Sequence, residues 1–284
     1  MPVSMVYRIG GILGSVDYLV SGTGRRQRML KNISGVCAGS QRQTAKILTD
    51  NLKNHCRTVL EFIKYPQITS ANLDLVVSFQ GLEHIDRPLA QGRGVVLATS
   101  HFGAKQLLQV GLGTRGYPVN QINYHMRSDE LTFVQKNVAQ RMRMNIEERI
   151  PAHFIPADGF MRSAFKCLKK NELLIIAADG SGLRARMDRS FAPFDFLGRR
   201  MLFPTNPVSL ALRTGAAMVP AFVVRDGSRH TVIIERPIPL EGRAKEEGVK
   251  AYIAVLEKYV RAYPALWEFW EEFDEENLLG EVVL

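Results

Sequence analysis

A histidine and an aspartate follow two apolar runs of the sequence, at positions where α/β proteins place reactive side chains. His101 follows the run 94–100, and Asp179 follows the run 173–177. Apolar runs that alternate with helical patterns form parallel sheets, and ligands bind at the carboxyl ends of such strands. We therefore expect His101 and Asp179 at one sheet edge, where an imidazole base and a carboxylate can share a site. Local packing or capping by a lone histidine is the alternative interpretation.

The pattern of apolar residues predicts an α/β fold with a mainly parallel central sheet flanked by helices. The expected strands lie near 94–99, 118–123, 152–156 and 171–177, and the expected helices lie near 41–64, 103–112, 129–144, 158–169 and 243–263. Runs at 217–224 and 231–234 predict a hairpin at the far end of the sheet. We expect an N-terminal helical segment at 1–70 and an α/β body at 71–284 that form one compact unit.

The N-terminal segment has an apolar stripe with helical spacing. The stripe consists of Met5, Ile9, Ile12, Leu13, Val16 and Val20. Next to the basic run 25–28, such a helix either lies in a membrane interface or packs on the protein's own core. A spanning helix is not expected, because no stretch has the roughly 18 uncharged apolar residues that one needs. Arg8 and Asp17 interrupt the stretch, which also argues against a signal peptide.

Charge is unevenly distributed along the chain. The net charge is +9, yet residues 264–284 contain seven acidic residues and no lysine or arginine, so the rest is strongly basic. A basic surface attracts nucleic acid, an anionic membrane or phosphorylated ligands. No nucleic-acid-binding module is recognisable, so we do not expect nucleic acid as a partner. The three cysteines have no C-x-x-C spacing, which predicts neither a disulfide framework nor a zinc site.

Arginines and aromatic residues alternate between residues 180 and 203, where a long loop is expected. The arginines there are Arg184, Arg186, Arg189, Arg199 and Arg200. Guanidinium groups bind phosphate oxygens in pairs, and aromatic residues can line a groove for an acyl chain. The segment therefore either binds an amphiphilic phosphate-bearing ligand or is a solvated basic loop. Arg141 and Arg143 are further basic candidates, although cations near a helix end also interact favourably with its dipole.

A glycine pattern at 111–116 matches the G-x-G-x-x-G fingerprint of dinucleotide-binding proteins. That fingerprint requires a strand before it and a helix after it. Here the predicted helix precedes and the predicted strand follows. The glycines are therefore expected to end a helix, and no dinucleotide cofactor is predicted.

Several short motifs occur together in a family-specific order. They are Thr99–Gln106, Ala178-Asp179-Gly180, Phe191–Phe194, Leu197-Gly198, Thr214–Pro220 and Tyr263–Trp267, which includes a Pro-x-x-Trp sequence. In this order the chain resembles the bacterial lipid A lauroyl/myristoyl acyltransferase family of the lysophospholipid acyltransferase-like superfamily. The resemblance implies a glycerolipid acyltransferase-like fold.

The resemblance also implies an activity and a place in the cell. Such proteins move a fatty acyl chain from an acyl carrier protein or coenzyme A thioester to a hydroxyl or amine of a glycolipid or similar amphiphile. They lie on the cytoplasmic face of the bacterial inner membrane, an anionic surface, and need no metal or redox cofactor. His101 would be the base, Arg141 or Arg143 the essential basic residue and Asp179 a further carboxylate. The loop arginines, among them Arg184, Arg186, Arg199 and Arg200, would bind phosphate.

Gln106 departs from the family motif, His-x4-Asp/Glu, at the position of the acid. An amide can accept a hydrogen bond from the imidazole and orient it, but it cannot stabilise an imidazolium by charge. Three explanations follow. Another acid replaces it, with Asp179, Glu83 and Asp86 as candidates; the acceptor needs little help from a base; or the protein binds lipid or a partner without catalysis.

The C-terminal segment departs from the family as well. Residues 268–276 are acidic and aromatic, where the family usually has basic residues. Such a segment would be repelled by an anionic bilayer. We expect that it could fold back onto the protein's own basic surface.

Overall fold

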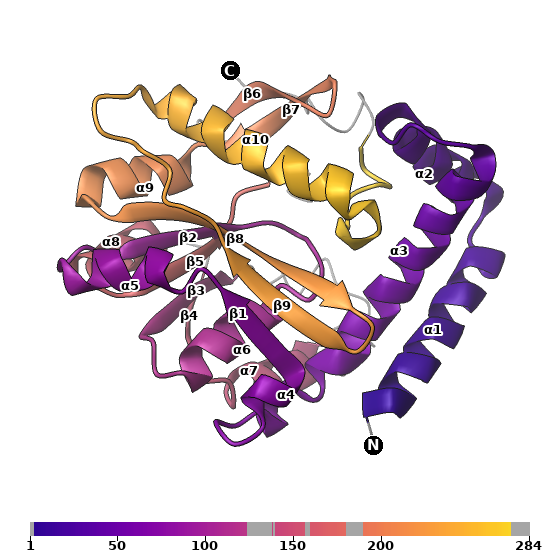
Figure 1. Cartoon of the computed structure of the whole chain (residues 1–284), viewed down its shortest axis with the longest axis horizontal. Coiled ribbons are helices and arrows are strands. Elements are labelled where there is room, and N and C mark those ends of the chain that lie inside the picture. The colour runs from indigo at the N-terminus through magenta and orange to yellow at the C-terminus, as the bar shows by residue number, and fades with distance from the viewer. Residues whose placement is uncertain (1–2, 124–137, 139, 157–159, 180–189, 274–284) are drawn as a thin grey trace.

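The computed structural model describes residues 3–123, 138, 140–156, 160–179 and 190–273. At its centre is a seven-stranded sheet with the order β1-β9-β8-β2-β5-β3-β4. The strands are β1 Val77–Gln80, β2 Val95–Thr99, β3 Val119–Asn123, β4 His153–Pro156, β5 Leu173–Ala177, β8 Ala217–Asp226 and β9 Arg229–Ile234. Every neighbouring pair is parallel except β8 and β9. The predicted mainly parallel α/β sheet is confirmed (Figure 1).

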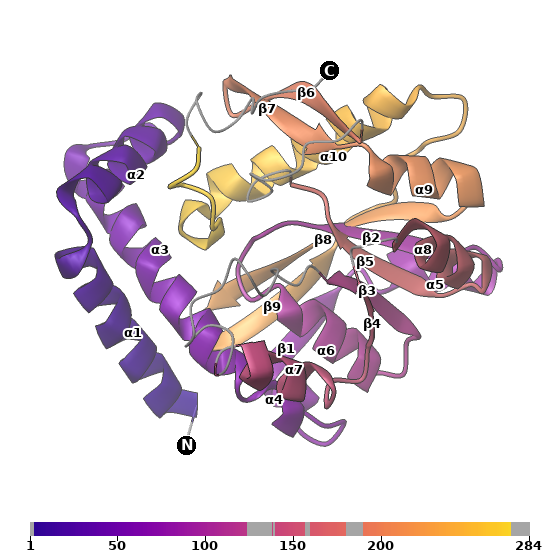
Figure 2. The ribbon, with the colours of Figure 1, turned by 180° about the vertical axis from the view of Figure 1, so that it is seen from behind.

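Helices cover both faces of this sheet (Figures 1 and 2). The described helices of the chain are α1 Val3–Val20, α2 Thr23–Val36, α3 Gln41–Phe62, α4 Leu73–Val76, α5 Glu83–Ala90, α6 Gln106–Thr114, α7 Arg141–Glu147, α8 Phe160–Lys169, α9 Asn206–Thr214 and α10 Lys245–Ala262. The strand β2 shows why two layers form. Val96 and Ala98 pack with α8, α9 and α10 in one core, whereas Val95 and Leu97 pack with α5 and α6 in the other.

The three N-terminal helices lie at one side of the sheet, and α1 packs along α3 through glycine (Figure 2). A Cβ atom at Gly14 would lie 2.4 Å from the Cα of Lys53, so only glycine permits this approach. The larger apolar residues of α1 therefore point outward, with Ile12 63% and Leu19 73% exposed. Most of the predicted apolar stripe does not pack on the protein's own core. Among the described helices, none is long and apolar enough to cross a membrane.

Three expectations about elements were wrong. A second sheet, the antiparallel hairpin of β6 (Phe191–Phe196) and β7 (Arg199–Pro204), occupies part of the expected loop 180–203. The hairpin of β8 and β9 is not at the far end of the sheet, because β1, which was not predicted, pairs with β9 and forms the edge. The helix after β2 begins at Gln106 rather than near residue 103, because a short loop intervenes.

Of the glycines at 111–116, only Gly116 lies at the end of the helix as expected, whereas Gly111 and Gly113 lie inside α6. Gly116 has a φ of +90° just after α6, a conformation that favours glycine. Inside the helix, a Cβ at Gly113 would lie 1.9 Å from the carbonyl oxygen of Pro151. Close packing and termination therefore account for both residues.

Candidate active site

His101 and Asp179 form a hydrogen-bonded pair at the carboxyl edge of the sheet. The His101 Nδ1 lies 2.8 Å from Asp179 Oδ1, and the backbone N–H of His101 donates to Asp179 Oδ2 over 2.7 Å. The Asp179 side chain is completely buried, whereas that of His101 is 29% exposed. One carboxylate thus holds both the main chain and the ring of His101.

The register of two neighbouring strands produces this pair. β2 and β5 are parallel, and Thr99 lies opposite Ala177. His101 and Asp179 are each two residues beyond these partners, and the N–H of Ala178 donates to the oxygen of Thr99 over 2.8 Å. The buried hydroxyl of Tyr252 on α10 donates to the same oxygen over 2.6 Å. The sheet and α10 together therefore place the two side chains.

The burial of Asp179 determines what the pair can do. A buried carboxylate needs hydrogen-bond donors, so the ring presents Nδ1–H to it and leaves the lone pair of Nε2 available. The carboxylate also stabilises the imidazolium that forms when Nε2 takes a proton. Such an arrangement can act as a general base toward a hydroxyl or a water.

Residues 264–273, called here the C-terminal strap, hold the loop of His101 from the other side. The N–H of Gly103 donates to the oxygen of Leu266 over 2.7 Å, and the N–H of Glu268 donates to the oxygen of His101 over 2.9 Å. The ring of Phe269 lies against the imidazole, with 4.5 Å between centroids. The loop is therefore held by hydrogen bonds to Asp179 on one side and to the strap on the other.

The strap is anchored by aromatic packing and by charge. Trp267, Trp270 and Phe273 are completely buried. The Nδ2 of Asn51 on α3 donates to the oxygen of Trp267 over 2.7 Å, and Arg25 on α2 lies 2.7 Å from Glu271. The expectation that the acidic segment folds back onto basic residues is confirmed for the described residues up to 273.

Comparisons with known proteins identify the family. The sequence model of the bacterial lipid A biosynthesis acyltransferases matches residues 1–271. The chain belongs to this family. Phosphatidylinositol mannoside acyltransferase of Mycobacterium tuberculosis is 26% identical over 182 residues, which are 61% of this chain and 53% of that protein. Its counterpart from Mycolicibacterium smegmatis is 22% identical over 225 residues, 78% of this chain and 69% of that protein.

The chain therefore spans about half of the length of the Mycobacterium tuberculosis relative. Among solved structures, the 1-acyl-sn-glycerophosphate acyltransferase PlsC from Thermotoga maritima covers 92% of this chain and 96% of its own. Its sequence identity is 13% and its TM-score is 0.39.

Gln106, at the acid position of the acyltransferase motif, does not orient His101. It is the first residue of α6, and its Oε1 is buried without a hydrogen-bond partner among the described residues. The expected role of Gln106 as the orienting partner is wrong, because Nδ1 of His101 is engaged by Asp179. Of the three acids considered, Asp179 is the one on the imidazole. Asp86 instead accepts from the hydroxyl of Tyr117 over 2.6 Å.

Lys105 is a charged neighbour of this pair that the sequence reasoning missed. It lies just before α6. Burial lowers the pKa of its ammonium group, and the carboxylates of Glu268 and Asp179 oppose that shift by attraction. Its place four residues after His101 on a loop that leads into a helix was the available signal. Lys105 therefore lies within electrostatic range of Asp179 and Glu268.

The six arginines expected to bind phosphate have different surroundings. Arg143 on α7 lies 2.6 Å from Glu147, and its positive charge contributes to the lowered pKa of Lys105. Arg141 is exposed. Arg184 and Arg186 lie outside the described residues.

The two remaining arginines are on β7. Arg199 does not present its guanidinium to a ligand site as expected; it donates to Asn32 over 2.9 Å and to the oxygen of Phe273, and stacks over the Phe273 ring. Arg200 is exposed and pairs in register with Asp195. Arg199 therefore ties the hairpin to α2 and the strap.

Proposed function

We propose that this chain transfers a fatty acyl group from an acyl carrier protein or coenzyme A thioester to a hydroxyl of a glycolipid at a membrane surface. His101 removes the proton of the acceptor hydroxyl, and the oxygen then attacks the thioester carbonyl. The C–S bond breaks, and the leaving thiolate takes the proton from the imidazolium. The observation that supports this most is the buried Asp179 carboxylate on His101 Nδ1. It supplies the charge that Gln106 lacks, and so favours catalysis over a binding role without chemistry.

The choice of acceptor is supported by the names of the relatives. The mycobacterial relatives are phosphatidylinositol mannoside acyltransferases, which act on a lipid with a sugar headgroup. We extend to this chain only the class of acceptor, a sugar-bearing amphiphile. Arg143 and Lys105 are the cations near the pair that could bind phosphate of the donor or the acceptor.

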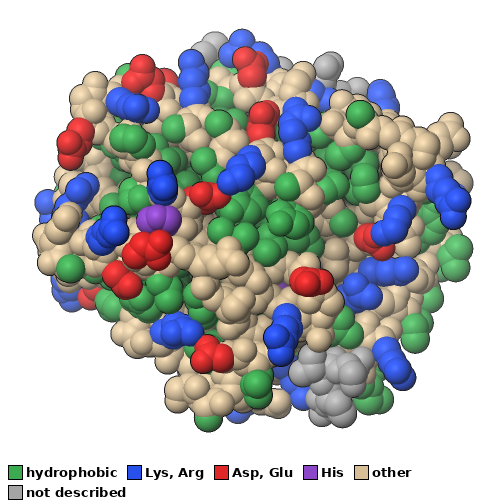
Figure 3. All heavy atoms as spheres, in the orientation of Figure 1, with side chains coloured by type: hydrophobic (Ala, Val, Ile, Leu, Met, Phe, Trp, Pro, Cys, Tyr) green, Lys and Arg blue, Asp and Glu red, His purple; other side chains and the backbone are tan. Residues whose placement is uncertain are grey.

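The outward face of α1 supports a position on the membrane. Its exposed apolar residues are Met5, Ile12, Leu13, Val16, Leu19 and Val20. Basic residues follow at once in α2. A helix with an apolar face beside cations lies in the headgroup region of an anionic bilayer. On the face seen in Figure 3, lysine and arginine are spread widely among acidic residues and form no single basic patch. We propose α1 as the contact with the membrane. The cytoplasmic face of a bacterial inner membrane is the surface we propose.

A membrane test compares two apolar residues that are exposed on different helices. Leu19→Glu on α1 should lower binding to vesicles of anionic phospholipid by about tenfold or more, because it places a charge in the apolar contact. Leu212→Glu on α9, 40% exposed, is the control and should leave vesicle binding unchanged. Equal binding by both variants would contradict the role of α1.

To test the activity, the protein is incubated with an acyl thioester and vesicles that contain a glycosyl diacylglycerol. The masses of the lipid products are then measured by mass spectrometry. The wild type should add one acyl chain. His101→Ala should lower the rate about 10²–10⁴-fold, the usual contribution of a general base. His153→Ala is the control, because His153 is an exposed histidine at the start of β4. Unchanged transfer by His101→Ala would leave lipid binding without catalysis as the function of this chain.

A further inference from the structure

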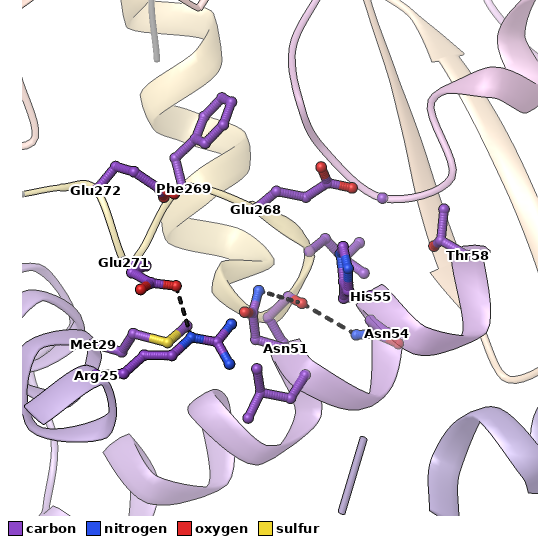
Figure 4. Close-up of a pocket in the computed structure, with 14 residues that line it drawn as sticks. Arg25, Met29, Asn51, Asn54, His55, Thr58, Glu268, Phe269, Glu271 and Glu272 are labelled. Carbon is purple, nitrogen blue, oxygen red and sulfur yellow. Dashed lines mark hydrogen bonds and ion pairs between the residues drawn. The ribbon is translucent and has the colours of Figure 1, made fainter. Parts of the chain in front are cut away.

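A cavity of about 220 Å³ lies between α2, α3 and the C-terminal strap (Figure 4). It shares a wall with the active site. Gly103 and Phe269 line it, and the Phe269 ring also packs on the imidazole of His101. Glu268, another lining residue, is bonded through its backbone to His101. A group bound in this cavity would therefore lie one aromatic ring away from the catalytic base.

The charges of the cavity do not suit a phosphate group. Three carboxylates line it, those of Glu268, Glu271 and Glu272. The guanidinium of Arg25 is in the lining as well, but it is paired with Glu271 over 2.7 Å and with Asp17 over 3.1 Å. Arg28 lies 3.6 Å from Glu271 as well, so the charge of Glu271 is offset by two arginines. The like charge that a phosphate dianion would meet is therefore chiefly that of Glu268, and like charges disfavour binding. The cavity is therefore expected to exclude an anionic headgroup.

The same lining does suit an uncharged group with many hydroxyls. Ionised carboxylates only accept hydrogen bonds, and hydroxyls can donate to them. In Figure 4 Glu271 points to Arg25, whereas Glu268 points away from that pair, toward the side of the cavity where His55 and Thr58 lie. Glu268 is thus a carboxylate that points away from Arg25, and it lies in the part of the strap that is hydrogen-bonded to His101.

The other walls and the size agree with a single ring. Met29, Leu52, Leu266 and Phe269 provide apolar surface on which the apolar face of a sugar can pack. The volume lies below the roughly 300–1,000 Å³ of sites for drug-sized ligands, so the cavity has room for a headgroup and not for a whole lipid.

We infer that this cavity is the subsite for an uncharged, hydroxyl-rich ring of the acceptor, and that Glu268 selects it against anionic headgroups. The inference rests on the proposed function and adds to it which part of the acceptor lies beside His101. Any phosphate of the acceptor lies outside this cavity.

Binding can be measured without catalysis, because the two tryptophans of the chain, Trp267 and Trp270, are both in the strap. Trp267 also contacts Phe269, with 6.2 Å between ring centroids. Tryptophan fluorescence of the full chain is recorded during titration with hexyl glucoside or hexyl phosphate, both below their micelle concentrations. The glucoside should give a saturable change, with a Kd at least tenfold lower than that of the phosphate.

Glu268→Gln and Glu246→Gln separate the site from a general charge effect. Both remove one negative charge, but Glu246 is exposed on α10 and outside the cavity. Glu268→Gln should raise the Kd for the glucoside about tenfold, the usual effect of losing a hydrogen bond to a charged group, and reduce the preference over phosphate. Glu246→Gln should change neither.

Two outcomes would overturn the inference: phosphate binding as tight as glucoside binding, or equal effects of the two glutamate variants. The proposed function is judged separately by acyl transfer. A wild type that selects the glucoside but transfers no acyl group would contradict the function alone, and a wild type that transfers without this selectivity would contradict the subsite alone.

Discussion

The two edges of the central sheet contain similar side chains that are connected differently. At the carboxyl edge, the imidazole of His101 is hydrogen-bonded to the buried carboxylate of Asp179. At the amino edge, a larger cavity of about 450 Å³ is lined by His153 and Glu172. There the carboxylate accepts from Asn120 Nδ2 over 2.8 Å, and within the described residues no hydrogen bond joins it to His153. Cavity size alone therefore does not separate the two edges. They differ in that a completely buried carboxylate is hydrogen-bonded to a partly exposed imidazole at the carboxyl edge.

Exchanging one carboxylate at each edge for its amide tests this difference with the largest expected effect. Asp179→Asn should lower acyl transfer about 10²–10⁴-fold, because the amide neither fixes the tautomer of His101 nor stabilises its charged form. Glu172→Gln, the control, should transfer at a rate within about twofold of the wild type. Similar losses in both variants would mean that the two edges do not differ as described.

Two buried asparagines allow a smaller and matched comparison. Asn51→Leu removes the hydrogen bonds to Ala265 and Trp267 that hold the strap, and Asn120→Leu removes those to Glu172 and Leu173. Each loss should destabilise the protein by about 1–3 kcal/mol in thermal or urea unfolding.

Of the two asparagines, only Asn51 holds the strap, which in turn supports the loop of His101, so the two variants should differ in activity. Asn51→Leu should also lower the transfer rate per folded molecule severalfold, while Asn120→Leu should not. If Asn120→Leu slows transfer as much as Asn51→Leu does, the strap has no special part in positioning His101.

Restoring the acid of the family motif should have little effect. Gln106→Glu places a carboxylate at a position where Oε1 has no hydrogen-bond partner among the described residues, while Nδ1 of the imidazole is already hydrogen-bonded to Asp179. We expect transfer within about threefold of the wild type, because a second buried acid adds a desolvation cost without a new partner. A gain of tenfold or more in steady-state transfer would show that Gln106 limits the base.

The thiol in the amino-edge cavity should be unreactive. Burial raises the pKa of Cys167 to about 11, so little thiolate exists at pH 8. The rate of Cys167 alkylation by iodoacetamide, followed by peptide mass spectrometry, should rise about tenfold per pH unit from pH 8 to 10, since the thiolate is the reacting form. A rate that levels off near pH 8 would indicate an activated nucleophile at that edge.

The two strands that precede His101 and Asp179 could be predicted because apolar runs that alternate with helical patterns are visible in the local sequence. The apolar runs before His101 and Asp179 marked two parallel strands, and side chains just beyond parallel strands meet at one edge. Asp179 was accordingly among the candidates to replace the motif acid. Whether Asp179 or Asp86 lies beside His101 depends on the pairing of β2 with β5. That pairing joins segments far apart in the sequence and cannot be predicted from either apolar run alone.

The remaining features depend on tertiary contacts that spacing alone does not reveal. Phe269 and Glu268 belong to a strap whose path is set by buried tryptophans and by asparagines more than 200 residues away. The outward direction of the apolar stripe of α1 follows from the glycines that pack on α3. Arg199 was predicted to bind phosphate, but its hydrogen-bond partners lie in two segments that are distant in the sequence.

The central claim, that Asp179 orients His101 as the base, is tested most directly by nitrogen NMR of protein labelled at its histidines, with His101→Ala used for assignment. We predict that neutral His101 is protonated at Nδ1 and unprotonated at Nε2, and that Asp179→Asn abolishes this preference. A wild-type His101 protonated at Nε2, or a tautomer unchanged in Asp179→Asn, would contradict it.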